Sequence, residues 1–75
     1  MTKDEIKQVV EETMKGMFLA IAKGIRAKRQ SIRDWDPGYS GNDEDWARAR
    51  AENDAKETIR QSMDDIADVL EEAAQ

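Results

Sequence analysis

One short stretch, Asp36-Pro37-Gly38-Tyr39-Ser40-Gly41-Asn42, divides this chain into two segments that both have the pattern of helices. The stretch holds the only proline, two of the four glycines and the only tyrosine of the 75 residues. Proline and glycine break helical runs, and their clustering marks a turn. We therefore expect one all-α domain, residues 1–75, built as an antiparallel helical hairpin. The expected elements are a helix over about 3–35, a turn over 36–42 and a second helix over about 43–73.

Capping signals support both helix starts. Thr2 and Glu5 have the spacing of a capping box, in which each side chain satisfies a free backbone N–H of the first turn. Asn42 is a favourable N-cap, and the three acidic residues that follow it suit the positive end of the helix dipole. Both segments therefore begin with residues typical of helix N-termini.

The apolar residues of both segments recur at helical steps of three, four or seven residues. From Ile59 onward the spacing is that of a coiled-coil seam, and the apolar arc of the first helix is wide enough to need more than one neighbour. The seam residues that we predict are Val10, Met14, Met17, Ile21, Ile25, Ile32, Ile59, Met63, Ile66 and Leu70. Gly16 and Gly24, which weaken a helix interior, suggest close approach of the second helix, with Gly24 level with Ala55.

A two-helix hairpin of this size makes a small core, and such domains usually need an additional stabilising feature. The chain contains no cysteine and no histidine, which excludes disulfides and the usual zinc sites. Oligomerisation is the remaining common solution. We therefore predict that the hairpin forms a homodimer, a four-helix bundle whose shared core is the predicted seam.

Catalysis, metals and cofactors are not expected. Without histidine or cysteine, the commonest general base and the strongest nucleophile are missing. The acids near the turn match an EF-hand loop poorly, because Pro37 and Tyr39 disrupt the pattern. Most carboxylates are therefore expected to be solvated surface.

The basic residues between 15 and 33 occur without any acid among them, although the net charge of the chain is −5. Helical projection places several on one outer face, near Leu19: Lys15, Arg26, Arg29 and Arg33. This face has three interpretations: a solvated surface, salt bridges to an acidic helix of a partner subunit, or a docking surface for RNA, DNA or an acidic protein. Overall charge argues against general nucleic-acid binding.

Three of the four aromatic residues, Trp35, Tyr39 and Trp46, lie at or beside the turn. They either fold over the end of the hairpin and hold the loop, or form a binding hot spot, since tryptophan and tyrosine dominate such sites.

These observations predict a non-catalytic protein–protein interaction module, an inhibitor or regulator that binds and modulates another protein. The alternatives are a nucleic-acid-binding regulator that uses the basic face, and a purely structural assembly component. Short, acidic, cysteine-free helical chains are common among phage-encoded host-takeover and counter-defence factors, an association that rests on size and composition alone. The N-terminus lacks the apolar run of a secretion signal and no apolar stretch is long enough to span a membrane, so we expect a cytoplasmic protein without membrane contact.

Overall fold

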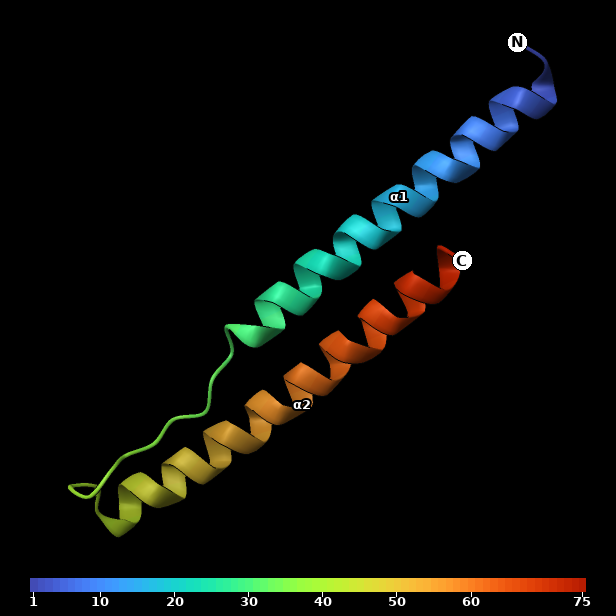
Figure 1. Ribbon diagram of the computed structural model, residues 1–75. Helices are drawn as coiled ribbons and strands as arrows, with labels where there is room; N and C mark the ends of the chain where they lie inside the picture. The colour runs from blue at the N-terminus through green and yellow to red at the C-terminus, as the bar shows by residue number, and fades with distance from the viewer.

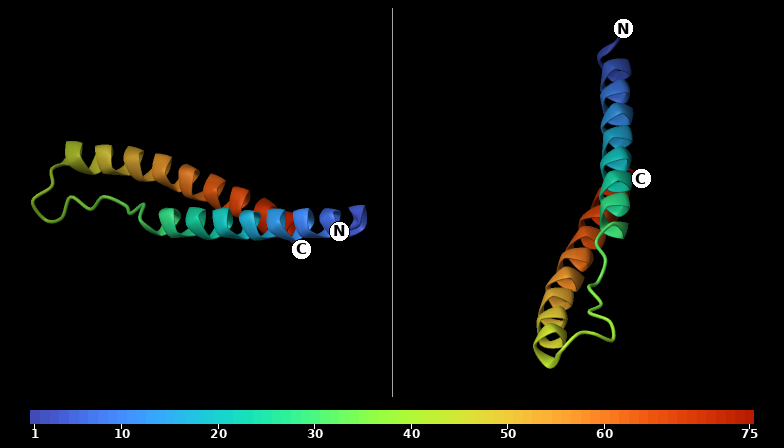
Figure 2. Two further views of the ribbon diagram at one scale, coloured as in Figure 1. Left: turned by 90° about the horizontal axis from the view of Figure 1, so that it is seen from above. Right: turned by 90° about the vertical axis from the view of Figure 1, so that its left-hand side faces the viewer.

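The computed structural model describes residues 1–75 and contains two helices, α1 (Lys3–Gln30) and α2 (Asp43–Ala73), and no strand. The helices run antiparallel and form a thin rod of 68 × 14 × 12 Å (Figure 1; Figure 2). The predicted all-α helical hairpin is confirmed. Neither helix has an apolar stretch of the length that crossing a membrane requires.

Side-chain caps begin both helices. Thr2 Oγ1 accepts a hydrogen bond from the Glu5 N–H at 3.1 Å, which is the first half of the predicted capping box. At α2 both halves form: Asn42 Oδ1 accepts from the Asp45 N–H at 2.8 Å, and Asp45 Oδ2 accepts from the Asn42 N–H at 3.3 Å. α2 therefore spans the range expected from the sequence.

α1 ends at Gln30 instead of continuing to residue 35. The Ser31 hydroxyl donates to the Lys28 carbonyl at 2.6 Å and helps to close the last turn. Residues 31–42, which we call the connecting segment, then run beside the first half of α2 (Figure 1). Ile32, Arg33 and Trp35 are thus outside the helix in which the sequence pattern placed them.

The ion pairs between the helices fix their relative position. Arg26 lies beside Asp68, so the C-terminal end of α2 reaches only the middle of α1. The N-terminal part of α1 therefore extends past the end of α2 without a neighbouring helix (Figure 1). The expected pairing of Gly24 with Ala55 is wrong, because the longer connecting segment shifts α2 along α1. A Cβ atom added at Gly24 would have nothing within 4 Å.

The interior of this hairpin is very small. Four residues are buried: Ala22, Ala49, Arg60 and Ala67. Half-buried residues flank the alanines on the faces that α1 and α2 turn toward each other, among them Phe18, Ile25, Met63 and Leu70. No large apolar side chain is fully enclosed.

Candidate functional site

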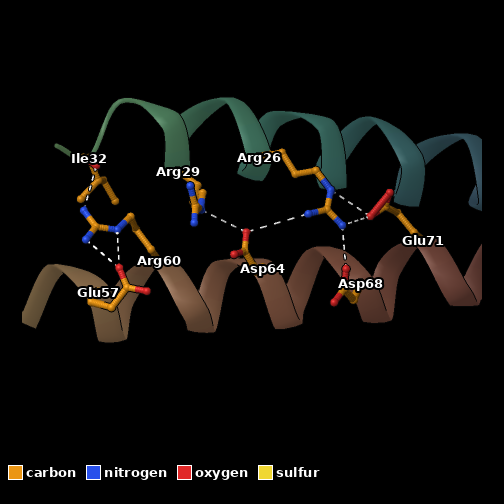
Figure 3. A network of polar contacts seen from close by, with 8 residues as sticks. All are labelled: Arg26, Arg29, Ile32, Glu57, Arg60, Asp64, Asp68 and Glu71. Carbon is orange, nitrogen blue, oxygen red and sulfur yellow. Dashed lines mark hydrogen bonds and ion pairs between the residues drawn. The ribbon is translucent and has the colours of Figure 1, made fainter.

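The contact between α1 and the C-terminal half of α2 includes a line of arginines and carboxylates (Figure 3). Arg26 of α1 binds Glu71 through Nε and Nη2, binds Asp68 Oδ1 at 2.7 Å, and lies 3.9 Å from Asp64 Oδ1. Arg29 Nε lies 3.2 Å from Asp64 Oδ1, an ion pair without hydrogen-bond geometry. The hydrogen bonds to Glu71 and Asp68 raise the pKa of Arg26 above its ordinary value, so the guanidinium stays charged.

This arrangement corrects the helical projection. Arg26 and Arg29 do not lie on an outer face, because the acids of their own chain's α2 occupy the position beside them. Their side chains are 39% and 38% exposed. Of the predicted basic face, Arg33 and Lys15 remain exposed and form no ion pair with the chain's own carboxylates.

Arg60 of α2 joins the connecting segment to the helix. Its side chain is 11% exposed and donates to the Ile32 carbonyl at 3.1 Å, to Asp34 Oδ1 at 2.8 Å and to Glu57 Oε2 at 2.7 Å. The hydrogen bonds to Glu57 and Asp34 raise the pKa of Arg60. Lys56 adds a bond to the Arg33 carbonyl at 2.9 Å.

Asn53 holds the centre of the connecting segment through two hydrogen bonds to one residue. The Trp35 N–H donates to Asn53 Oδ1 at 2.8 Å, and Asn53 Nδ2 donates to the Trp35 carbonyl at 3.0 Å. The sequence pattern did not indicate Asn53 or Arg60, because both act on backbone groups at least 18 residues away. The available signal was weak: an asparagine inside a helix, and an arginine three residues from Glu57, which is the spacing of an ordinary ion pair on a helix surface.

The turn forms the far end of the rod. Asp36 Oδ1 accepts the Gly38 N–H at 2.9 Å, and Gly38 has φ 72°, a conformation that favours glycine. Gly41 lies so close to Pro37 that a Cβ there would approach Pro37 Cβ to 2.5 Å and Trp46 Nε1 to 3.2 Å. Beside this packed turn lies an open hollow of about 390 Å³, lined by Asp36, Gly38, Tyr39 and Trp46.

The predicted aromatic cluster is only partly brought together. Tyr39 and Trp46 line the same hollow, Tyr39 fully exposed and Trp46 45% exposed. Trp35 lies apart from them, half-buried and held by Asn53. Two of the three aromatic residues are therefore accessible at one end of the molecule.

Most of the predicted seam is open in the single chain. The residues about half exposed are Val10, Met14, Met17, Ile21, Ile59 and Ile66, and Leu19 is 50% exposed as well. Ile25, Ile32, Met63 and Leu70 are half-buried. A shallow apolar hollow on α2 is lined by Asp65, Ile66, Val69 and Leu70.

No group of three or more potential ligand side chains is placed to hold a metal ion. Comparisons with family models, curated proteins and solved structures each returned no match to this chain.

Proposed function

We propose that this chain is a non-catalytic protein–protein interaction module that works as a homodimer and binds another protein to modulate its activity. The observation that supports the proposal is the placement of its apolar side chains. Three buried alanines are the whole apolar interior, whereas thirteen large apolar or aromatic side chains are at least 45% exposed. Large exposed apolar patches on a folded chain are typical of interaction sites.

Each helix carries a stripe of exposed apolar residues, and the two stripes lie on the same side of the hairpin. At about 100° per residue, the α1 stripe from Ile6 to Ile21 lies roughly 105° around the helix from the residues that face α2. The α2 stripe from Ile59 to Ala73 lies roughly 115° from the residues that face α1. Both offsets are anticlockwise when each helix is viewed from its own N-terminus. Because the helices are antiparallel, both stripes face one side of the hairpin, and the α1 stripe continues past the C-terminal end of α2 (Figure 1).

The area that the single chain exposes beyond that of a compact monomer has the size of a dimer interface. The single chain exposes 6142 Å², whereas a compact monomer of 8.5 kDa exposes about 4,700 Å². The excess of about 1,500 Å² per chain matches what each subunit of an obligate homodimer buries, about 1,000–2,500 Å². Two hairpins that pack through their apolar sides form the proposed four-helix bundle.

A dimer formed in this way leaves the turn ends free to contact a second protein. The proposed regulatory contact uses the hollow beside Tyr39 and Trp46, since exposed tryptophan and tyrosine supply much of the binding energy in protein interfaces. Leu19 lies on the side of α1 away from the apolar stripe and away from the turn.

The test is affinity capture from cells that naturally make the protein, with quantitative mass spectrometry. We expect a partner that is captured by the wild type, lost with the double variant Trp46→Ala/Tyr39→Ala and retained with Leu19→Ala. Light scattering on each variant checks that the oligomer is intact. If the wild type captures nothing above an empty matrix, or all three proteins capture the same set, the proposed function is wrong.

A further inference from the structure

We propose that the hollow at the turn is a binding site for an arginine or lysine side chain from a basic segment of a partner protein. We call it the turn site and define it by Asp36, Gly38, Tyr39 and Trp46. The inference rests on the proposed function and names the chemistry of the partner. It draws on two properties of the turn site that occur together: accessible aromatic rings and a carboxylate free to accept.

The first property is aromatic. Tyr39 is fully exposed and Trp46 is 45% exposed, and both border the same open volume of about 390 Å³. A tryptophan or tyrosine ring attracts a guanidinium or ammonium group that lies over its face. The Trp46 ring lies close to the packed turn, because its Nε1 is 3.2 Å from the position that a Cβ atom on Gly41 would take. Both rings are accessible to a cation that enters the hollow.

The second property is negative charge. Asp36 Oδ1 accepts the Gly38 N–H, and the carboxylate makes no ion pair with any lysine or arginine of the chain. Residues 36–46 carry four acids and no base. This contrasts with the acids of α2 near the C-terminus, where Asp64, Asp68 and Glu71 are already paired with Arg26 or Arg29. Asp36 therefore has capacity for a cation that those carboxylates lack.

The turn suits a side chain better than a free ion. No three carboxylates converge there on a metal position, and the lining is part aromatic and part acidic. A long side chain with an apolar stem and a charged head matches both parts of this lining. Arginine is favoured over lysine, because its planar guanidinium stacks on aromatic faces and also binds a carboxylate through two N–H groups.

The experiment uses the full chain and two short synthetic peptides of equal length. One carries three arginines separated by serine and glycine, and the other carries citrulline, which has the same shape without the charge, in their place. Binding is followed by isothermal titration and by the side-chain indole N–H signals of the two tryptophans in NMR spectra. We expect the arginine peptide to bind at least about tenfold more tightly than the citrulline peptide, and to shift the Trp46 indole signal while the Trp35 signal stays in place.

Two substitutions locate the site. Asp36→Asn and Trp46→Ala should each weaken binding of the arginine peptide about three- to tenfold. Asp54→Asn is the matched control, because it removes the same charge from an exposed position of α2 outside the turn site. It should change the affinity less than about twofold. Circular dichroism checks that each variant keeps its helices.

Equal binding of the two peptides, an unmoved Trp46 signal, or equal losses with Asp36→Asn and Asp54→Asn would each overturn the proposal. The last outcome would show attraction to overall negative charge only. These results are independent of the capture experiment, since the peptides need no natural partner. A partner that is captured by the wild type and lost with Trp46→Ala/Tyr39→Ala, combined with failure of the peptide test, would leave the proposed function standing and show that the partner contacts the turn site without a cationic side chain.

Discussion

Removal of the Asn53 side chain tests whether the connecting segment is held as the structure shows. Asn53→Ala abolishes two hydrogen bonds, from the Trp35 N–H at 2.8 Å and to the Trp35 carbonyl at 3.0 Å. Each neutral hydrogen bond contributes about 1 kcal/mol net, so the two together contribute about 2 kcal/mol. Alanine is the better helix former by roughly 0.6 kcal/mol, which offsets part of this loss. The expected net decrease in the free energy of unfolding is about 1–2 kcal/mol.

The measurement is urea denaturation followed by far-UV circular dichroism at one fixed protein concentration, because oligomerisation shifts apparent stability. Asp54→Ala is the matched control: the residue is adjacent, exposed, and its side chain makes no hydrogen bond. It gains similar helix propensity and should be neutral or slightly stabilising. Amide exchange at Trp35 should accelerate in Asn53→Ala alone.

The result that refutes the reasoning is equality of Asn53→Ala and Asp54→Ala. If α1 continued through residue 35, as the apolar spacing suggests, the Trp35 N–H would donate within the helix and its carbonyl would face solvent at the helix end. Asn53 would then have no special partner, and its replacement by alanine would have the same small effect as the control. Comparison of the two variants therefore distinguishes a connecting segment that begins at residue 31 from a helix that continues through residue 35.

Two further substitutions test the apolar surface and the interior. Ile21 lies on the apolar stripe and Leu19 on the opposite side, and both are about half exposed. Ile21→Asp should weaken the proposed dimer at least about tenfold, whereas Leu19→Asp should leave the mass in light scattering unchanged. Equal behaviour of these two variants would remove the basis for the dimer. Ala67 is fully buried, so Ala67→Leu adds volume without space for it. It should lower the free energy of unfolding by about 1–3 kcal/mol, whereas Ala47→Leu on the surface should not. No difference in denaturation between the two leucine variants would mean that the helices do not pack at Ala67.

Local signals in the sequence predicted local structure well. The start of α2 follows from Asn42 and the acids behind it, and the structure confirms a complete capping box there. The hairpin itself follows from Pro37 and the neighbouring glycines. In both cases the residues that determine the conformation lie within a few positions of the conformation that they determine.

The end of α1 was not predictable in the same way. Ile32 and Trp35 continue the helical spacing, so periodicity extends the helix through them. The structure ends it because Arg60 and Asn53, from another helix, bind the Ile32 carbonyl and both backbone groups of Trp35. A pattern along one segment contains no information about partners supplied by a distant one, and the register of α1 against α2 was misjudged for the same reason.

The candidate site shows a second limit of sequence reasoning. Projection correctly grouped Arg26 with Arg29 but assigned the group to the outside, because charged faces are usually solvated. Here the inner contact carries the charge and the stripe from Ile6 to Ile21 stays open. The hydrophobic pattern of α1 shows which face is apolar. It does not show whether that face packs against α2 or stays open for another contact.

The polar contact between the helices and the open apolar side contribute differently to the stability of the hairpin. Ion pairs between partly exposed groups contribute little stability, and three buried alanines add little apolar burial. The polar contact between α1 and α2 therefore specifies the register of the hairpin more than it stabilises it. Under the proposed dimer, most of the favourable free energy comes from the apolar side that a single chain leaves open. Folding and association are then one equilibrium. The melting temperature in thermal denaturation should therefore rise with protein concentration. A melting temperature that stays constant over a dilution of about a hundredfold would contradict this coupling.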